Sequence, residues 1–327
     1  MAASPKRHWY QFSLRTLLGL MAAVAVLGGL FSARWNRAQR QAAFVNHLRW
    51  SDDAHYDYEV FMDRGPTYPV KHSWDDESPY PLFLRQWLSK DFFHSVVCIE
   101  LWDPSHDAKE RLRTLERMRI DLPDLRRLWV YDYATTKDIE QIVRISSLRS
   151  LDFTFLDIEG KDISALARAT QLEDLSIWTQ SLSDDEIRPL MSLTHLSRLS
   201  ILATQGDQSA SLAGEWLTSF SRLEDFDAQG LPLDNRAAKH LATLTKLKCL
   251  RLEGARVDDA ALADLATLTQ LEELDLSQTR ITDAGLKHLT GLTGLKRLSL
   301  NRTAITDLGI THLAGMNRLE ALLTPIP

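Results

Sequence analysis

The stretch LEELDLSQTRITDAGLKHLTGLTG, residues 271–294, is followed without a gap by LKRLSLNRTAITDLGITHLAGMNR, residues 295–318. The two segments carry the same kinds of residue at the same positions, 24 residues apart. A period of about 20–30 residues with regularly spaced leucines is typical of a solenoid, in which each copy is one structural unit that stacks on the next.

Three apolar positions define each copy of the repeat. Leu271, Leu274 and Leu276 mark one copy, and most steps to the neighbouring copies are 24 residues long. One step is 27 residues long, where residues 204–211 form an extra segment, and the first step is longer still. The other triplets are Val96/Ile99/Leu101, Leu125/Leu128/Val130, Leu148/Leu151/Phe153, Leu172/Leu175/Ile177, Leu196/Leu199/Ile201, Leu223/Phe226/Ala228, Leu247/Leu250/Leu252 and Leu295/Leu298/Leu300, with Leu319/Leu322 as a truncated last copy.

Each copy predicts a short strand followed by a helix. Leu274 and Leu276 stand two residues apart between polar neighbours, which is the pattern of a strand with one buried face. Asp283 is a suitable N-cap for the next helix, whose Leu286 and Leu289 face the same core. A single strand and helix cannot bury this apolar surface alone, so the copies are expected to stack. The predicted fold class is α/β, a curved solenoid with a parallel sheet inside and helices outside.

The pattern LxxLxLxxTxITDxGLxxLxxL resembles the leucine-rich repeat in its 24-residue variety, over residues 96–327. The leader FSLRTLL…VAVLGG, within residues 12–29, resembles that of membrane-anchored bacterial leucine-rich-repeat proteins. The resemblance implies a horseshoe with a concave sheet. The family often has asparagine on the inner turn, where this chain has Thr279, Thr303, Ala255 and Gln180, so a continuous asparagine ladder is not expected.

The chain divides into a short basic tail (1–15), a transmembrane signal anchor (16–33), a juxtamembrane segment with the N-terminal cap (34–95) and the repeat domain (96–327). Residues 16–33, TLLGLMAAVAVLGGLFSA, carry no charge, and as a helix they would cover about 27 Å of the roughly 30 Å hydrocarbon core. The alternatives are a buried soluble helix and a cleaved signal peptide. Cleavage requires a small residue at the −3 position, where this chain has Phe31, so we favour the uncleaved anchor. Residues 82–93, LFLRQWLSKDFF, predict an amphipathic helix that caps the first repeat.

Charge is distributed unevenly along the chain. Residues 1–40 contain six basic residues and no acidic one, whereas the remainder contains 32 basic and 44 acidic residues. An acidic body repels phosphate backbones, so nucleic acid is not an expected partner. Three basic side chains lie on each side of the apolar run, so the positive-inside rule nearly balances. We expect a single-pass protein of the inner (cytoplasmic) membrane, with the tail in the cytoplasm and the repeat domain outside.

No motif of a serine hydrolase, phosphate-binding loop, zinc protease or dinucleotide site occurs in the sequence, so we expect neither enzymatic activity nor a cofactor. His240, His288 and His312 share one repeat position, but helices about 8–10 Å apart are too far apart to share a metal ion. The acidic run 75–77 lacks the spacing of a calcium loop. Cys98 and Cys249 lie six copies apart, about 29 Å at about 4.8 Å per strand, and are not expected to pair.

Residues that alternate with the buried strand positions are expected on the concave face. The early copies place aromatic residues there, whereas the later copies have none in the same columns. Aromatic side chains gathered on one exposed face suggest a recognition site. The alternatives are that the segment before the repeats folds over the rings, or that the early copies shift register. The predicted ligand-binding residues are Trp102, Trp129, Tyr131, Asp152 and Trp178.

Two functions are compatible with these features. The first is a membrane-tethered recognition module that binds a protein, peptide or glycan on its concave face. The second is a structural or assembly protein of the cell envelope without a dedicated ligand. An enzyme within residues 34–95 is disfavoured, because that segment is too short for a core of its own.

Overall fold

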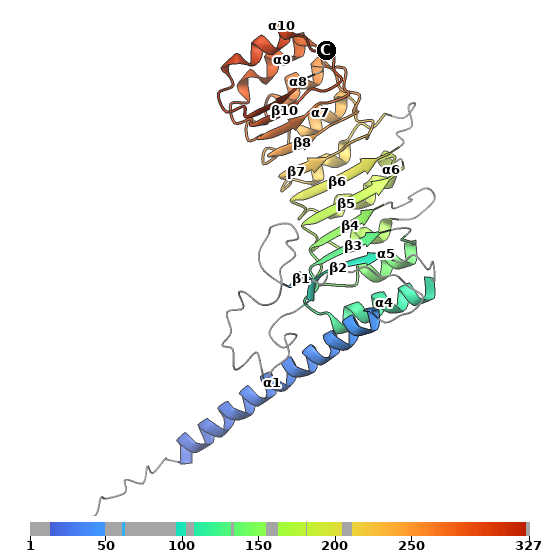
Figure 1. Cartoon of the computed structure of the whole chain (residues 1–327), viewed down its shortest axis with the longest axis vertical. Helices are drawn as coiled ribbons and strands as arrows, with labels where there is room; N and C mark the ends of the chain where they lie inside the picture. Colours follow the sequence, from blue (N-terminus) through green and yellow to red (C-terminus); the bar gives the residue numbers. More distant parts are fainter. Residues whose placement is uncertain are drawn as a thin grey trace, which may run out of the picture.

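The structure is a computed structural model that describes residues 14–49, 61–62, 96–102, 108–131, 134–154, 163–180, 182–204 and 211–324. Within these residues a single eleven-stranded sheet runs the length of the solenoid, with its strands in chain order (Figure 1). The first strand is antiparallel to the second, and all later neighbours are parallel. The strands are β1 (Phe61–Met62), β2 (Val96–Trp102), β3 (Arg127–Tyr131), β4 (Ser150–Thr154), β5 (Asp174–Thr179), β6 (Arg198–Ala203), β7 (Asp225–Asp227), β8 (Cys249–Arg251), β9 (Glu273–Asp275), β10 (Arg297–Ser299) and β11 (Ala321–Leu323).

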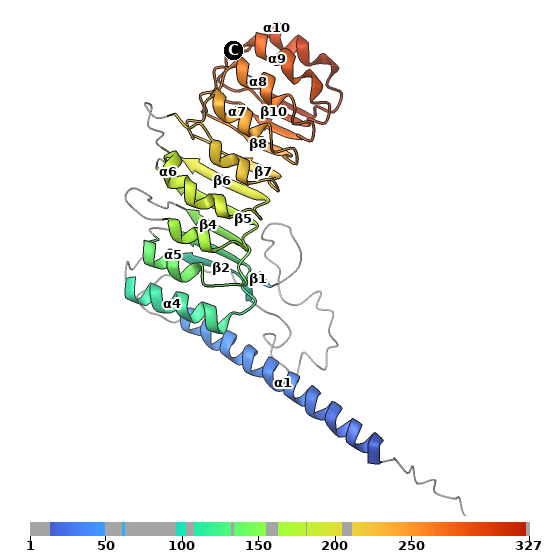
Figure 2. The same ribbon diagram turned by 180° about the vertical axis from the view of Figure 1, so that it is seen from behind.

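Short helices connect successive strands and cover one face of the sheet, and the stack curves with the sheet on its inner side (Figures 1 and 2). A repeat of 24 residues leaves room for only one or two helical turns, and several copies use a 3₁₀ turn. The α-helices are α1 (Leu14–Arg49), α4 (Ala108–Asp121), α5 (Thr136–Ile142), α6 (Asp184–Ile187), α7 (Asn235–Leu241), α8 (Asp259–Leu265), α9 (Asp283–Leu286) and α10 (Asp307–Ile310). The 3₁₀ helices are η1 (Ser164–Arg168), η2 (Arg188–Ser192), η3 (Glu215–Ser219), η4 (Lys287–Gly291) and η5 (Thr311–Gly315).

The strand register confirms the alignment of the repeats, including the early copies whose sequence is degenerate. Leu274 pairs with Leu250 on one side and Leu298 on the other. Phe153 of β4 lies between Val130 of β3 and Ile177 of β5. The members of the triplets from residue 125 to residue 300 are at most 3% exposed. Burial of each such leucine, isoleucine or phenylalanine stabilises the fold by about 1.5–3 kcal/mol. These residues belong to one core cluster that continues from repeat to repeat.

The Thr-Asp-x-Gly segment links each repeat to the one before it. Thr282, not the predicted Asp283, is the N-cap of α9, and its hydroxyl accepts a hydrogen bond from the amide of Ala284. The carboxylate of Asp259 in the preceding repeat accepts from the Thr282 amide at 2.8 Å and from its hydroxyl at 2.6 Å. A Cβ on Gly285 would lie 2.3 Å from Asp259 Oδ1. Glycine therefore leaves room for the carboxylate that joins the two repeats.

The next repeat uses the same arrangement. Asp283 accepts hydrogen bonds from the amide and hydroxyl of Thr306 at 2.8 and 2.6 Å, and a Cβ on Gly309 would lie 2.2 Å from Asp283 Oδ1. Hydrogen bonds to the ionised carboxylate hold the pKa of Asp283 below its ordinary value. The recurring acid is thus structural, as the sequence suggested, but its partner lies in the neighbouring repeat.

The turn after each strand adopts a left-handed backbone in four successive copies. Gly230 and Gly254 have φ values of 75°, while Gln278 and Arg302 adopt 57° and 55° at the same repeat position. In this part of the chain the Thr279 hydroxyl donates to the carbonyl of its own turn, at Leu276, at 2.5 Å. Thr303 makes the corresponding bond at 2.6 Å. In both turns a threonine hydroxyl bonds to a backbone carbonyl of its own repeat, at the position where the family often has asparagine.

The N-terminal end of the solenoid is covered by α1 and β1. Ala38, Gln41 and Phe44 of α1 are at most 2% exposed, and Phe44 belongs to the hydrophobic core. β1 pairs with the outer edge of β2. The predicted capping helix, residues 82–93, lies outside the described residues. The predicted cap at 82–93 thus stays a prediction, and the described residues that cover this end belong to α1 and β1.

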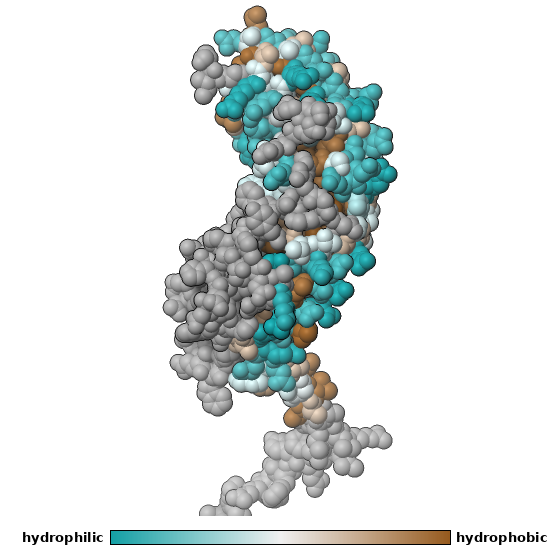
Figure 3. Space-filling view, turned by 90° about the vertical axis from the view of Figure 1, so that its right-hand side faces the viewer, coloured by the Kyte–Doolittle hydropathy of each residue, from teal (hydrophilic) through white to brown (hydrophobic). Residues whose placement is uncertain are grey.

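The first half of α1 extends away from the solenoid (Figure 1), and its residues 24–31 include exposed apolar side chains (Figure 3). Val24, Val26, Leu27 and Leu30 are 62–65% exposed, and Phe31 is 49% exposed. The predicted membrane span, residues 16–33, falls within this helix. None of the helices in the described part of the chain is both long and apolar enough to cross a membrane.

Replacement of Gly285 by alanine is expected to lower the free energy of unfolding, although alanine favours a helix over glycine by about 1 kcal/mol. The added methyl group would displace the Asp259 carboxylate and break its bonds to Thr282, which costs about 1–3 kcal/mol. Urea unfolding followed by circular dichroism measures the change.

The matched control is Gly291→Ala, at a glycine of the same repeat whose added Cβ would meet nothing within 4 Å. This variant should be as stable as the parent protein or slightly more stable. Equal midpoints for the two variants would show that the glycine has no such role.

Candidate functional site: the concave face of the sheet

On the face of the sheet that the helices leave open, equivalent residues of successive strands form columns of side chains. In β5 the residues alternate between partly exposed and buried, as expected when only one face packs on the core. Strand pairing places the residues of each column next to one another. The central column is Glu100, Trp129, Asp152, Ser176, Ser200, Asp227, Arg251, Asp275 and Ser299.

The predicted binding residues lie on neighbouring strands at the N-terminal end of this face. Trp129 of β3 pairs with Asp152 of β4, and Trp102 of β2 pairs with Tyr131 of β3. Trp178 lies on β5, opposite Leu202 of β6. The alternative of a register shift in the early copies is thus excluded for these strands.

Three of the predicted side chains are described in detail. Trp129, Asp152 and Trp178 are each partly exposed, so they reach the surface without being fully solvated. Each of the three already has an interaction within the protein. The side chains of Trp102 and Tyr131 lie outside the described part of the structure, and only their strand positions are known. Their role as ligand-binding residues stays a prediction.

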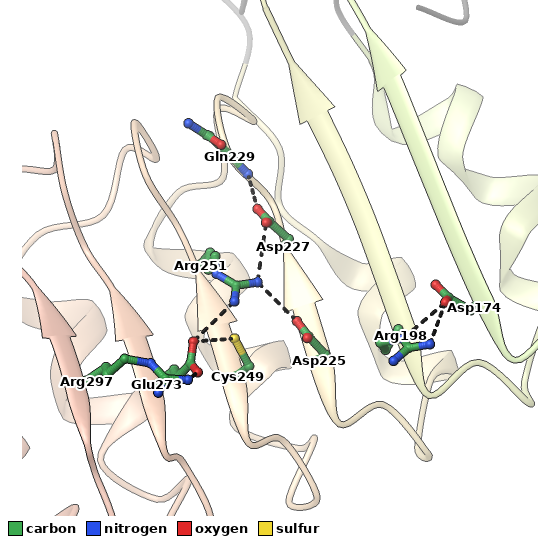
Figure 4. Close-up of polar contacts among 9 residues, drawn as sticks. All are labelled: Asp174, Arg198, Asp225, Asp227, Gln229, Cys249, Arg251, Glu273 and Arg297. Carbon is green, nitrogen blue, oxygen red and sulfur yellow. Dashed lines mark hydrogen bonds and ion pairs between the residues drawn. The ribbon is translucent and has the colours of Figure 1, made fainter. Parts of the chain in front are cut away.

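A charged network that was not predicted from the sequence lies in the C-terminal half of the same face. Arg251 of β8 lies at its centre (Figure 4), with a guanidinium nitrogen 3.5 Å from both Asp225 and Asp227 on β7. Its other terminal nitrogen is 3.2 Å from Glu273 on β9, and Glu273 also pairs with Arg297 on β10. One arginine thus connects three adjacent strands through side chains.

Opposite charges about one repeat apart, 22 to 26 residues, were the signal for this network. Arg198 pairs with Asp174 at 2.7 Å across β5 and β6. At the start of the strands, Lys248 pairs with Glu224 at 2.6 Å and Lys296 pairs with Glu272 at 2.7 Å. Each of these exposed pairs contributes about 0–1 kcal/mol to the stability of the fold. These pairs also reinforce the register.

The network contacts a buried cysteine, Cys249, whose thiol is held in its protonated form. Cys249 is 8% exposed and its thiol is free, and the absence of a Cys98–Cys249 bridge stays a prediction, because the Cys98 side chain lies outside the described part of the structure. Its thiol donates to Glu273 at 3.5 Å. Burial, followed by repulsion from Asp225, raises the pKa of Cys249 to about 12. The thiol stays protonated at neutral pH and is a poor nucleophile.

Burial also raises the pKa of Asp227, while the Arg251 guanidinium and the amide of Gln229 oppose the shift. The Arg251 guanidinium, 3.5 Å from Asp227, thus offsets part of the cost of burying this carboxylate. Among the described residues, no group of three or more histidines, cysteines and acidic residues could hold a metal ion. The acidic run 75–77 lies outside the described residues.

The fold and this face define a class of protein, a curved solenoid of strand–helix repeats with a side-chain-lined inner sheet. Residues 269–322 match the family described as Leucine Rich repeats (2 copies). That segment therefore consists of leucine-rich repeats, and the earlier copies continue it with the same strand register. A search of the curated proteins finds no match to this chain.

Several solved structures are similar to the chain. One is an internalin C2 from Listeria monocytogenes, with a TM-score of 0.45 and 20% identity over 65% of this chain and 83% of the other. Another is TLR13 in a complex with ssRNA13, with a TM-score of 0.43 and 16% identity over 65% and 33% of the two chains. A third is the plant peptide hormone receptor RGFR1 in complex with RGF2, with a TM-score of 0.41 and 13% identity over 64% and 37%.

Alkylation of Cys249 at pH 8 is expected to be about a thousandfold slower in the folded protein than in urea. With the pKa raised to about 12, only about one thiol in ten thousand is ionised at that pH. Mass spectrometry of the peptide that contains Cys249 after timed exposure to iodoacetamide measures the rate.

Asp225→Asn should speed the reaction only in part, because burial is the larger cause of the shift. An equal rate for the folded and the urea-unfolded protein would contradict the environment described for this thiol.

Proposed function

We propose that the protein is a membrane-tethered recognition module that binds a protein, peptide or glycan on the N-terminal half of its concave face. The contrast between the two halves of that face carries the proposal. In the C-terminal half, Arg251 and its acidic neighbours pair with one another. In the N-terminal half, Trp129 of β3 and Trp178 of β5 are partly exposed.

The paired half is a poor place for a ligand. Polar groups that already satisfy one another would have to be separated, and unpaired charges are costly when a ligand excludes water. Trp129 and Trp178 offer a different surface, since an indole can bury about 150–250 Å² and still donate a hydrogen bond. The interactions that each ring already has would hold it in one orientation, which reduces the entropy lost on binding.

The tether is proposed from the first half of α1. Its apolar residues from Val24 to Phe31 are exposed, and the run of residues 16–33 carries no charge. Exposed apolar side chains on a projecting helix are costly in water and stable in a bilayer. The side chains of residues 16–22, which complete the run, lie outside the described part of the structure. We propose a single-pass anchor in the inner (cytoplasmic) membrane.

The second candidate function is a structural protein of the cell envelope without a dedicated ligand. The regular, self-paired C-terminal half of the concave face favours it, because such a surface stabilises the stack without needing a partner.

Affinity capture from an envelope extract, with the full-length protein in detergent as bait, separates the two functions. Trp129→Ala or Trp178→Ala should weaken binding of the captured ligand by at least about 2 kcal/mol, or about thirtyfold in Kd, as expected for hot-spot residues. Both variants should keep the parent circular dichroism spectrum.

Asn301→Ala is the matched control, because Asn301 follows β10, at the opposite end of the sheet from Trp129. It is partly exposed and its side-chain amide donates to Ser299 at a long 3.4 Å, so its replacement should cost little. Ser277 is unsuitable as a control, since it is 4% exposed and its hydroxyl is 2.7 Å from that of Ser299. Undiminished capture by a folded Trp129/Trp178 double variant would favour the structural function.

The proposed orientation places the tail in the cytoplasm and the repeats outside. A reporter enzyme that is active only outside the cytoplasm, fused after Pro327, should therefore be active. A well-expressed but silent fusion would indicate the reverse orientation and leave the tether itself unaffected.

A further inference from the structure

We propose that the end of the solenoid beside α1 contacts anionic phospholipid headgroups and thereby fixes the repeat domain at the membrane surface. The inference rests on the membrane tether proposed above. The surface concerned, here called the basal surface, consists of exposed residues of α1, of α4 and of the segment before β3. Its members are Arg37, Arg40, Arg113, Arg119, Ile120 and Arg126.

Helix geometry places this surface at the depth of the headgroups. Arg37 lies four residues after Ala33, the last residue of the apolar run, which is about 6 Å along the helix. Its guanidinium is 2.6 Å from the carboxylate of Asp124, just after α4. The headgroup layer is about 5–8 Å thick on each side of the hydrocarbon core. The end of α4 therefore lies about level with that layer.

The C-terminal end of α4 is the end nearest to the apolar run. The guanidinium of Arg117 lies over the ring of Phe44, 5.1 Å from its centroid. Residue 117 thus contacts the solenoid-proximal part of α1, while Asp124 contacts Arg37, closer to the apolar run. α4 consequently runs antiparallel to α1, and the views of Figures 1 and 2 agree with this arrangement. Arg119 and Ile120 belong to the last turn of α4.

The charge of this end is opposite to that of the rest of the chain. Residues 34–44 contain three basic residues and no acidic one, and residues 108–127 contain seven basic and four acidic residues. Two of the acids, Asp121 and Asp124, are paired with Arg117 and Arg37. Within the described residues, no ion pair is formed by Arg40, Arg113, Arg119 or Arg126.

An exposed apolar residue completes the surface. Ile120 is 56% exposed and stands beside Arg119. In water the apolar surface of such a side chain stays hydrated. At a membrane interface it can be buried at the boundary between headgroups and acyl chains. A basic surface with an apolar centre matches an anionic bilayer in both charge and polarity.

Headgroup contact would decide how the recognition face is presented. α1 continues without a break from the apolar run into the buried residues Ala38 and Phe44, so the proposed anchor extends directly into a helix that packs on the solenoid. A second contact through α4 would prevent rotation of the solenoid about the anchor. The concave face would then keep one orientation relative to the membrane.

The test is hydrogen exchange of the unmodified full-length protein in lipid nanodiscs. Discs of phosphatidylcholine alone are compared with discs in which part of this lipid is replaced by phosphatidylglycerol. The amides of residues 117–126 should exchange about fivefold more slowly in the anionic discs, the effect expected when a single arginine binds an anionic surface. The difference should disappear in 1 M NaCl, where the Debye length falls to about 3 Å.

Charge reversal locates the contact. Arg119→Glu combined with Arg126→Glu should abolish the difference between the two lipids. Arg222→Glu combined with Arg318→Glu, at exposed arginines of distant repeats, makes the same change in net charge and should preserve it.

The outcomes separate this inference from the tether. Failure of the protein to insert into either disc would overturn both. Insertion into both discs with equal exchange of residues 117–126 would overturn the headgroup contact and leave the tether in place. A lipid-dependent difference that persists in the Arg119/Arg126 variant would also overturn the basal surface as its cause.

Discussion

The structure depends on the stacking of neighbouring repeats, because no single repeat can bury its own apolar residues. Each strand contributes apolar side chains to the core, and the copies before and after it complete their burial. A fixed period keeps equivalent residues in contact along the whole sheet. The same dependence makes the ends of the stack its vulnerable points. At the N-terminal end, Phe44 of α1 closes the core that the first repeat would otherwise expose.

The register that builds the core also organises the polar residues. Asp259 and Asp283 each accept hydrogen bonds from the threonine of the following repeat, and the glycine of that repeat leaves space for them. Along the sheet, acidic and basic side chains that stand 24 residues apart form ion pairs between adjacent repeats. Polar pairing and apolar packing thus select the same alignment, which is why the degenerate copies and the longer 27-residue step keep it.

The concave face is divided by this pairing into two chemically different parts. Around Arg251 the side chains satisfy one another and hold a protonated thiol and a half-buried carboxylate in place. Burial is the largest cause of the raised pKa values of both Asp227 and Cys249. The strands nearer α1 instead carry Trp129 and Trp178, which are partly exposed and belong to the proposed recognition site. The helix α1 runs without a break from the proposed anchor to Ala38 and Phe44, which pack on the N-terminal end of the solenoid.

The sequence by itself determined the period, the buried triplets and the parallel order of the strands, because apolar spacing in a repeat is a local property that recurs in every copy. It also placed Trp129 beside Asp152, since strand register follows from the period. Only the tertiary structure showed that Asp259 bonds to Thr282, that Arg251 joins three strands, and that α1 covers the first repeat. These contacts join residues of different repeats or segments, and their geometry depends on how the copies twist and pack, which spacing along one chain does not specify.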